Sequence, residues 1–300
     1  MCVVELRFTK SARRPVSGCV TTTLCSTGGH FACISVRSSV EWPSRIAFFS
    51  GFVMSCTARK PSTNERIAGD SLFYRPGDSV VSARLGANRF IWDLHYPGAK
   101  HLSDIVDDEG FVDGPVAPPG RYSVRLVSGS DTVKRTFAVL GDPRVKTNAA
   151  SYAAQFAIAM RVHDAIDTLA SSVERIQTMQ HQIDERVKAT ADASYAKKVA
   201  DAAKPLRAKL EEVRAAMAEV NSHVDEITLI YPVRIYNQLL TVNAMVQGSD
   251  DPPTAGMLQS MDDLEKQLAV QKAKLAAIAS GDMAAFNALL TENKAGTVYP

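Results

Sequence analysis

Apolar residues recur at steps of three and four through most of the chain after Asn148, and this period limits the fold more than any other feature. From Leu206 to Ile227 the steps alternate between four and three without a break, which is the heptad pattern of a packed helix seam. Such a seam cannot stay in water, so the helices must pack on one another or on a partner. Residues 145–300 are therefore expected to form an antiparallel bundle of about four long helices.

Cap and turn residues place the ends of these helices. Thr147 or Asn148 is expected to cap a first helix of about 40 residues, because a side-chain oxygen can accept from the free N–H groups of the first turn. A fourth helix should start at Thr254 and end at Gly281, where Asp282 is expected to cap a short last helix. The inward positions expected in the third helix are Ile235, Leu239, Val242 and Met245.

Before the helices the apolar period changes to two, which indicates half-buried β-strands. The three alternating runs are Arg89–Leu94, Tyr122–Leu126 and Val133–Leu140. In the first run Phe90, Trp92 and Leu94 share one face. No helical crossover separates the runs, so residues 61–144 are expected to form a small antiparallel β-sandwich. The fold class that follows is α+β, with the sandwich preceding the helical bundle.

The first 60 residues differ from the rest in composition and have no sustained period. They hold eight Lys and Arg against two acidic residues, and all five cysteines of the chain, none in a CxxC pair. Three readings stay open for residues 1–60: a disordered arm, a non-native stretch such as a frameshift product, and an unusual folded cap. Because the basic excess is local, no nucleic-acid partner is expected for the folded part. The cysteine-free remainder fits either the cytosol or the periplasm.

Neither a membrane span nor a signal peptide is recognisable in the sequence. A span needs a run of roughly 18–20 apolar residues, and no run approaches that length. The nearest, Ile46–Met54, is short and begins far from the N-terminus.

The sequence offers no catalytic, cofactor-binding or metal-ligating constellation. Its six histidines lack metal-site spacing, and His163 is expected to be structural because no Ser, Cys or carboxylate pair is placed to work with it. Asp93 is the only carboxylate on a predicted strand, and glycoside hydrolysis needs a pair. The acidic loop from Asp104 to Asp113 fits a solvated loop or a calcium site without EF-hand spacing. Glycine-rich phosphate loops are absent, and helical charges such as Asp262 fit solvated faces.

Two segments carry a resemblance to a known family. Gly86–Pro97 reads Gly-Ala-Asn-Arg-Phe-Ile-Trp-Asp-Leu-His-Tyr-Pro, and Gly114–Leu126 reads Gly-Pro-Val-Ala-Pro-Pro-Gly-Arg-Tyr-Ser-Val-Arg-Leu. They resemble the C-terminal region of bacterial sortilin-like proteins with neuraminidase repeats, often labelled glycosyl hydrolases. The Trp-Asp and Pro-Gly-x-Tyr elements are also similar to the Ig-like domain of flagellar hook-capping proteins. The resemblance implies an Ig-like sandwich with Trp92 and Tyr122 in its core and a tight turn at Gly120, followed by a helical tail.

The chain departs from that family in what precedes this region. Family members place a large β-propeller there, where their ligand binding or hydrolysis is expected, whereas this sequence has no Ser-x-Asp-x-Gly-x-Thr-Trp repeat. Residues 1–60 stand in place of the first strands, so the sandwich is expected to be incomplete, with an exposed edge that can pair with another strand. The resemblance thus implies a C-terminal fragment of a periplasmic or secreted protein.

The leading functional hypothesis is a non-catalytic accessory module whose partner is a β-propeller domain or another protein. A first alternative is an independent interaction protein that forms a homo-oligomer through spare apolar helix surface. A second alternative is a glycoside hydrolase-related enzyme, which would be supported by glycosidase turnover that is lost on Asp93→Asn.

Overall fold

The computed structural model describes the side chains of residues 92, 94–102, 114–126, 132–220 and 231–299. It describes by backbone alone residues 4–10, 22–25, 32–36, 53–57, 86–88, 127–128 and 131. The chain divides into two compact units. The β unit comprises Met1–Gly98, Asp113–Ala157 and Ser249–Pro253, and the helical unit comprises Ala99–Val112, Ile158–Gly248 and Thr254–Pro300.

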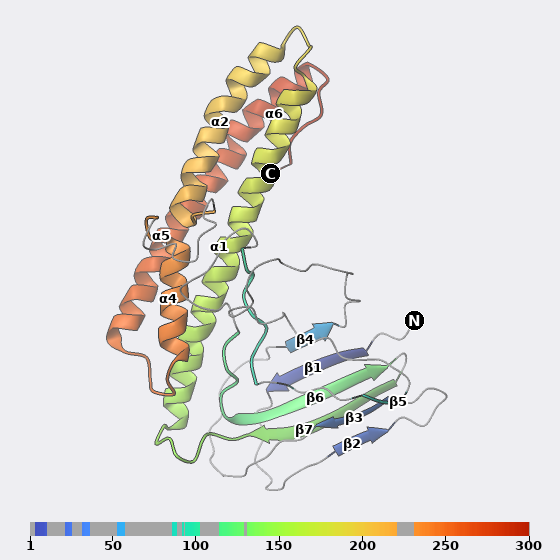
Figure 1. Ribbon diagram of the computed structural model, residues 1–300, viewed down its shortest axis with the longest axis vertical. Coiled ribbons are helices and arrows are strands. Elements are labelled where there is room, and N and C mark those ends of the chain that lie inside the picture. The colour runs from blue at the N-terminus through green and yellow to red at the C-terminus, as the bar shows by residue number, and fades with distance from the viewer. Residues whose placement is uncertain are drawn as a thin grey trace. The chain divides into compact units, whose positions relative to one another are not determined.

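The β unit contains a four-stranded antiparallel sheet in the order β4, β1, β6, β7 (Figure 1). Its strands are β1 (Val4–Lys10), β4 (Val53–Thr57), β6 (Gly120–Ser128) and β7 (Asp131–Val139). A second sheet has the order β2 (Thr22–Cys25), β3 (Ala32–Val36) and β5 (Gly86–Asn88), with β3 and β5 parallel. The predicted α+β order, strands and then helices, is confirmed, and the β6–β7 pair is antiparallel as expected, whereas β3 and β5 are not.

β6 and β7 form a hairpin, and burial confirms the alternation predicted for β7 at Lys134, Thr136, Phe137 and Val139. On β6 the alternation is not seen in burial at Ser123, which is 2% exposed although it lies on the face opposite Tyr122 and Val124. The residues on the inner face of the hairpin are Tyr122, Val124, Leu126, Phe137 and Val139, all buried or half-buried. Lys134 and Thr136 lie on the opposite face and are exposed. Aromatic and β-branched residues suit this arrangement because they pack well on a pleated, half-buried surface.

The predicted strand Arg89–Leu94 is wrong at the residues that the structure describes. Trp92 is outside any strand, and Leu94 is 40% exposed with a left-handed φ of 71°. The indole Nε1 of Trp92 donates to the carbonyl oxygen of His95 at 2.8 Å, which closes a turn and breaks the two-residue period. His95 instead forms an isolated antiparallel bridge with Val116. Phe90 lies outside the described residues.

Residues 1–60 are described only as the backbone of β1, β2, β3 and β4. The prediction that this segment is disordered or non-native stays a prediction. The same holds for the domain boundaries at residues 60 and 144.

The helices stand in three columns. Their bounds are α1 (Ala149–Ala189), α2 (Ala196–Met217), α4 (Ile235–Gln247), α5 (Ala255–Ser280) and α6 (Asp282–Glu292). α1 alone makes the first column, α2 and α4 the second, and α5 and α6 the third (Figure 1). Neighbouring α1 and α2, and α2 and α5, are antiparallel as predicted. The expected bundle of about four long helices forms only three columns, because α4 follows α2 in one of them. In the described part of the chain, none of the helices is both long and apolar enough to cross a bilayer.

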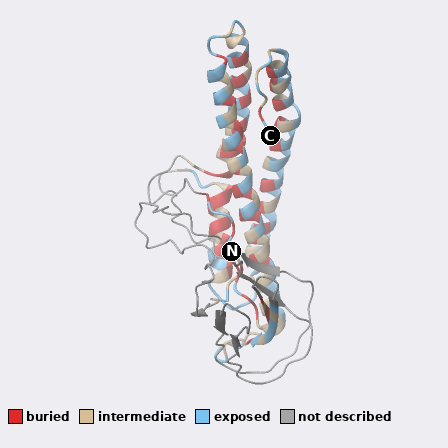
Figure 2. Ribbon diagram, turned by 90° about the vertical axis from the view of Figure 1, so that its right-hand side faces the viewer, coloured by how far each residue is buried: buried red, intermediate tan, exposed pale blue. Residues whose placement is uncertain are grey.

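The core of the helical unit lies along the facing sides of the columns (Figure 2). α1 buries one residue every three or four positions, as its period predicts; the members without exposed surface include Leu169, Val173, Ile176, Met179 and Ile183. Leu206, Leu210, Val213 and Met217 do the same on α2, as the heptad predicts. Burying these apolar faces is the main source of stability for such helices.

Two of the predicted caps are confirmed and one is wrong. The Asn148 side chain accepts from the N–H of Ser151 at 2.9 Å, and Thr254 accepts from Met257 at 3.2 Å. Gly281 stands at the cap position of α6, and Asp282 is the first helical residue. Its carboxylate binds Lys209 at 2.6 Å, so the side chain turns to another helix.

Two other expectations for the helices fail. Met245, expected inward, is 55% exposed. α2 ends at Met217 because Ala218 takes an extended conformation, whereas the heptad pattern continues to Ile227. An apolar period indicates which residues are buried, but it does not require that all of them belong to the helix. Val220 is half-buried beyond the end of α2, and Ile227 lies outside the described residues.

Candidate interaction site

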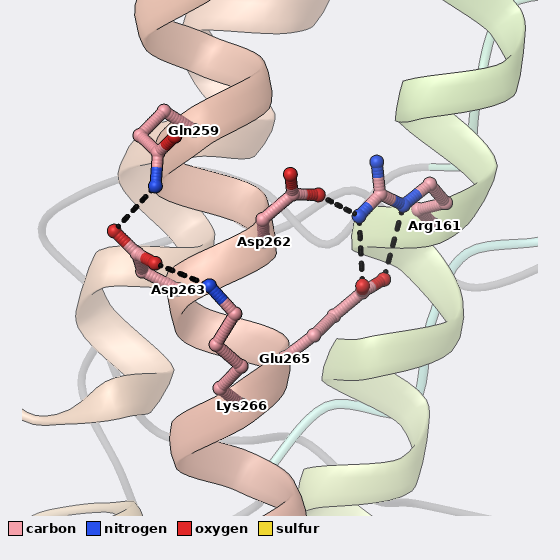
Figure 3. Close-up of polar contacts among 6 residues, drawn as sticks. All are labelled: Arg161, Gln259, Asp262, Asp263, Glu265 and Lys266. Carbon is pink, nitrogen blue, oxygen red and sulfur yellow. Dashed lines mark hydrogen bonds and ion pairs between the residues drawn. The ribbon is translucent and has the colours of Figure 1, made fainter.

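Arg161 of α1 is the centre of an ionic contact between α1 and α5 (Figure 3). Its Nε lies 3.1 Å from Oε1 of Glu265, and its Nη2 lies 2.7 Å from Oε2 of Glu265 and 2.6 Å from Oδ1 of Asp262. The hydrogen bonds to Glu265 and then to Asp262 raise the pKa of Arg161. A planar guanidinium with paired donors binds a carboxylate in a defined orientation. The contact therefore holds α1 and α5 in one axial register.

The same stretch of α5 carries a second polar group that stays on its own helix (Figure 3). Asp263 accepts from Nε2 of Gln259 and from Nζ of Lys266, each at 3.0 Å. These hydrogen bonds lower the pKa of Asp263. Because all three side chains are exposed, their contacts contribute little to stability.

Arg214 is a buried cation on α2, with its side chain 5% exposed. Its Nε and Nη2 donate to the carboxylate of Glu211 at 2.8 and 2.5 Å. Nε2 of Gln180 on α1 donates to the same carboxylate at 3.2 Å. The hydrogen bond from Arg214 lowers the pKa of Glu211. A charge is tolerated in a core only when it is paired, so this group ties α2 to α1.

Three further ion pairs join α2 to the other columns. They are Arg207 with Asp184 of α1 at 2.9 Å, Lys209 with Asp282 of α6 at 2.6 Å, and Glu212 with Lys274 of α5 at 2.9 Å. The side chains are substantially exposed, so each pair contributes little energy alone. The last two pairs show that α2 runs antiparallel to α5 and α6, and the Arg207 pair together with the Gln180–Glu211 contact shows that it runs antiparallel to α1.

Glu211→Gln is expected to flatten the acid dependence of the stability of the helical unit. Because the pKa of Glu211 is lowered, its carboxylate stabilises the folded state fully above the unfolded-state pKa of about 4.3. That contribution is lost as pH falls through the folded-state pKa. Urea unfolding followed by far-ultraviolet circular dichroism at about pH 5 and about pH 3 should show a smaller midpoint drop in the variant.

The matched control is Asp263→Asn, since the carboxylate of Asp263 also has a lowered pKa but bonds only within α5. The side chain of Glu211 is 47% exposed, so solvent screening limits the effect. Equal flattening in both variants would show that the contact between α1 and α2 carries no special weight.

The segment after α6 lies along the helical unit and is held by two side-chain amides. Asn287 of α6 donates from Nδ2 to the carbonyl oxygen of Val298 at 2.7 Å and accepts from the N–H of Val298 at 2.8 Å. Gln182 of α1 accepts from the N–H of Tyr299 at 2.9 Å. Val298 is buried, so this segment extends the core between α6 and α1.

An aromatic cluster fills the inner face of the β hairpin. Trp92 meets Tyr122 and Phe137 edge-on, with ring centroids 5.6 and 5.9 Å apart. The ring of Tyr96 lies 5.0 Å from that of Phe156, from the first turns of α1 that belong to the β unit. Edge-to-face pairs at these distances add to the stabilisation from burial. Tyr122 is a buried core residue, whereas Trp92 is half-buried and packs against that core.

The hydroxyl of Tyr122 holds the chain just before β6. It donates to the carbonyl oxygen of Pro118, four residues upstream, at 2.7 Å, and it contacts the hydroxyl of Tyr96. Burial raises the pKa of Tyr122, as it does that of Tyr96. The neutral phenol is therefore the form that the core accepts.

Tyr122→Phe should lower the free energy of unfolding of the β unit by about 1–3 kcal/mol, because the buried Pro118 carbonyl loses its donor. Tryptophan fluorescence during urea unfolding is the suitable readout, since Trp42 and Trp92 both belong to the β unit. Tyr299→Phe, at an exposed residue of the helical unit, is the control. A loss below about 0.5 kcal/mol on Tyr122→Phe would contradict the role given to the hydroxyl.

The candidate residues from the sequence are not gathered into one site by the described residues. His163 is half-buried, and its Nδ1 lies 2.9 Å from Oδ1 of the neighbouring Asp164, a contact that fits a structural role. Asp93 and the acidic loop from Asp104 to Asp113 lie outside the described residues. Within the described ranges, no group of three or more His, Cys, Asp and Glu is arranged to hold a metal ion.

Sequence reasoning missed the part that Asp262 plays. It placed this residue on a solvated helix face, whereas the structure turns Asp262 toward Arg161 and leaves Asp263 on the outer face. Asp262 and Glu265 are three residues apart beside the core position Leu264, and that spacing is the available signal. This spacing shows which face of the helix carries charge, but it does not identify Arg161 as the partner on α1.

Comparison with known proteins adds no relative: neither a protein-family model, nor a curated protein, nor a solved structure matches this chain.

Proposed function

We propose that this chain is a non-catalytic accessory module, in which part of an Ig-like sandwich is joined to a rigid helical bundle that packs against a β-propeller domain. The observation that carries the proposal is the ionic contact of Arg161 with Asp262 and Glu265. It holds the first and third columns in one register, while the pairs on α2 hold the second. A bundle held this way suits a spacer, because its faces keep fixed positions.

The Ig-like part of the proposal is supported by the surroundings of Tyr122. Ig-like sandwiches characteristically have a tyrosine near the start of a strand whose hydroxyl bonds to backbone a few residues upstream, and a buried tryptophan in the core. Tyr122 stands near the start of β6 and donates to Pro118, and Trp92 packs against its ring. The choice of a β-propeller as partner comes from the sequence resemblance to the C-terminal region of sortilin-like proteins.

Cross-linking of the full chain in its native cells tests this function. We expect exposed lysines of α5, such as Lys266 and Lys272, to be linked to a polypeptide that carries Ser-x-Asp-x-Gly-x-Thr-Trp repeats. Arg161→Ala should weaken these links because it frees α1 from α5, whereas Gln259→Ala, which touches only α5, should leave them unchanged. Links only to unrelated proteins, or glycosidase turnover that disappears on Asp93→Asn, would overturn the proposal.

One observation favours self-association as a second function. The outer face of α5 exposes Val270, which is 54% exposed, and the exposed neighbours on that helix include Ala269, Ala273, Ala276 and Ala277. An apolar stripe without bulky side chains allows two helices to approach closely. Sedimentation of the full chain at rising concentration should then show a dimer that Val270→Lys removes. A strict monomer at all concentrations would exclude this function.

A further inference from the structure

Among the described strands, none pairs with the outer edge of β7. β7 is the last strand in the order β4, β1, β6, β7, and its only partner among the described strands is β6. A strand with one free side presents N–H and C=O groups that can form hydrogen bonds with another extended chain. This edge differs from the one expected from the sequence, which was attributed to missing first strands, because β1 pairs with β6 on the side away from β7.

The side chains of β7 leave this edge open to solvent. Those that are exposed are Thr132, Lys134, Arg135, Thr136 and Ala138. Nη1 of Arg135 donates to the carbonyl oxygen of Lys134 at 3.0 Å, so a side chain reaches this oxygen from outside the ladder. The backbone groups of alternate residues point the same way in a strand, and the N–H of Thr136 therefore also faces outward.

The positive charges of Lys134 and Arg135 disfavour pairing of β7 with a second copy of itself and favour an acidic strand. In an antiparallel pair of two copies centred on Arg135, this residue would lie opposite itself, and a parallel pair in register would place Lys134 opposite Lys134. Like charges directly opposite one another weaken strand pairing, and lysines on edge strands oppose self-association. Carboxylates opposite the same two residues would instead attract.

The two cations also define a pattern for the partner. Lys134 and Arg135 are neighbours in the strand, so their side chains lie on opposite faces of the sheet. A matching strand needs acidic residues at two consecutive positions. On the inner face Arg135 is flanked by the half-buried Val133 and Phe137, which favour apolar residues opposite them.

We propose that the outer edge of β7 is a docking site for an extended segment of a partner protein with two consecutive acidic residues between apolar ones. The segment adds a strand to the sheet, and its carboxylates lie beside Lys134 and Arg135. This inference rests on the proposed accessory function, for which it names one point of contact. Backbone hydrogen bonds supply the affinity in this binding mode, and side-chain positions supply the specificity.

The test uses the full chain and labelled peptides that contain Val-Thr-Glu-Glu-Val or Val-Thr-Lys-Lys-Val, followed by fluorescence anisotropy. We expect the acidic peptide to bind at least about tenfold more tightly than the lysine peptide, because two attractive pairs replace two repulsive ones. Two further forms of the acidic peptide are N-methylated on alternate amides, one on the odd and one on the even positions. The form whose methylated amides face β7 should not bind. The double substitution Lys134→Glu and Arg135→Glu should reverse the preference.

Thr136→Pro and Thr136→Ala form a matched pair on the protein side. Proline removes an outward N–H but no hydrogen bond of the β6–β7 ladder, and edge strands tolerate it there. We expect binding to be lost in Thr136→Pro and kept in Thr136→Ala, with the tryptophan fluorescence midpoint unchanged in both.

Equal binding of the acidic and lysine peptides, undiminished binding of both N-methylated forms, or no binding of the acidic peptide overturns the β7 site. Cross-links to a protein with propeller repeats, found together with any of these results, leave the accessory function standing and place its contact elsewhere.

Discussion

Leu169→Ala should lower the free energy of unfolding of the helical unit by about 2–5 kcal/mol, the range found when a buried leucine is truncated in a packed core. Leu169 has no exposed surface and lies near the middle of α1, with Ile166 and Val173 beside it on the buried face. The cavity cannot collapse easily, because the neighbouring core side chains are themselves fully buried and closely packed. Urea unfolding followed by far-ultraviolet circular dichroism measures the loss as a lower midpoint with an unchanged slope.

Val270→Ala is the matched control for this prediction. It also shortens an aliphatic side chain, but one that is exposed on α5, so its effect should stay within about 0.5 kcal/mol. If the two substitutions changed the midpoint equally, the assignment of Leu169 to the core would be wrong.

Gly114→Ala should destabilise the β unit by about 1–3 kcal/mol or more, because a methyl group has no room there. A Cβ on Gly114 would lie 1.9 Å from the carbonyl oxygen of Tyr96 and 2.3 Å from that of Pro97. These atoms belong to backbone that is held by the hydrogen bond from the N–H of Tyr96 to Pro115, at 2.9 Å. Relief of the clash would therefore break a backbone contact, and tryptophan fluorescence during urea unfolding should report the loss.

Gly256→Ala provides a control with the opposite sign. Gly256 lies in the first turn of α5, and the nearest atom to an added Cβ is Oγ1 of Thr254 at 3.8 Å. Alanine in a helix is more favourable than glycine by about 0.5–1 kcal/mol, so this variant should gain stability. A Gly114→Ala variant as stable as the unmodified protein would show that Tyr96 and Gly114 are not in close contact.

The helices were predictable because a single physical requirement, burial of one face, leaves a period in the sequence. Leu169, Val173 and Ile176 recur at steps of four and three and are all buried. The ends of helices were predictable where a local side chain caps them, as at Asn148 and Thr254. These features depend on neighbours in sequence, which a reader of the sequence can see.

Features that depend on distant partners were not predictable. Nothing near Arg161 in the sequence indicates that Asp262 and Glu265 will lie beside it, since the residues meet only when α1 and α5 pack. The left-handed φ of Leu94 is equally hidden, because leucine has no intrinsic preference for that conformation and the surrounding loop imposes it. Burial and propensity restrict each residue's environment, and tertiary contacts select its partner.

The interruptions in the second and third columns of the bundle occur at different heights. Lys209 of α2 is level with Asp282, next to the break at Gly281, whereas α2 itself ends at Met217, about 12 Å farther along at the rise of an α-helix. α1 continues past both levels without a break. Every cross-section of the bundle therefore retains at least two unbroken helices, and a bending force meets no plane where it could fold the bundle like a hinge. The resistance to bending should accordingly be nearly uniform along the axis, as in a beam whose joints are staggered.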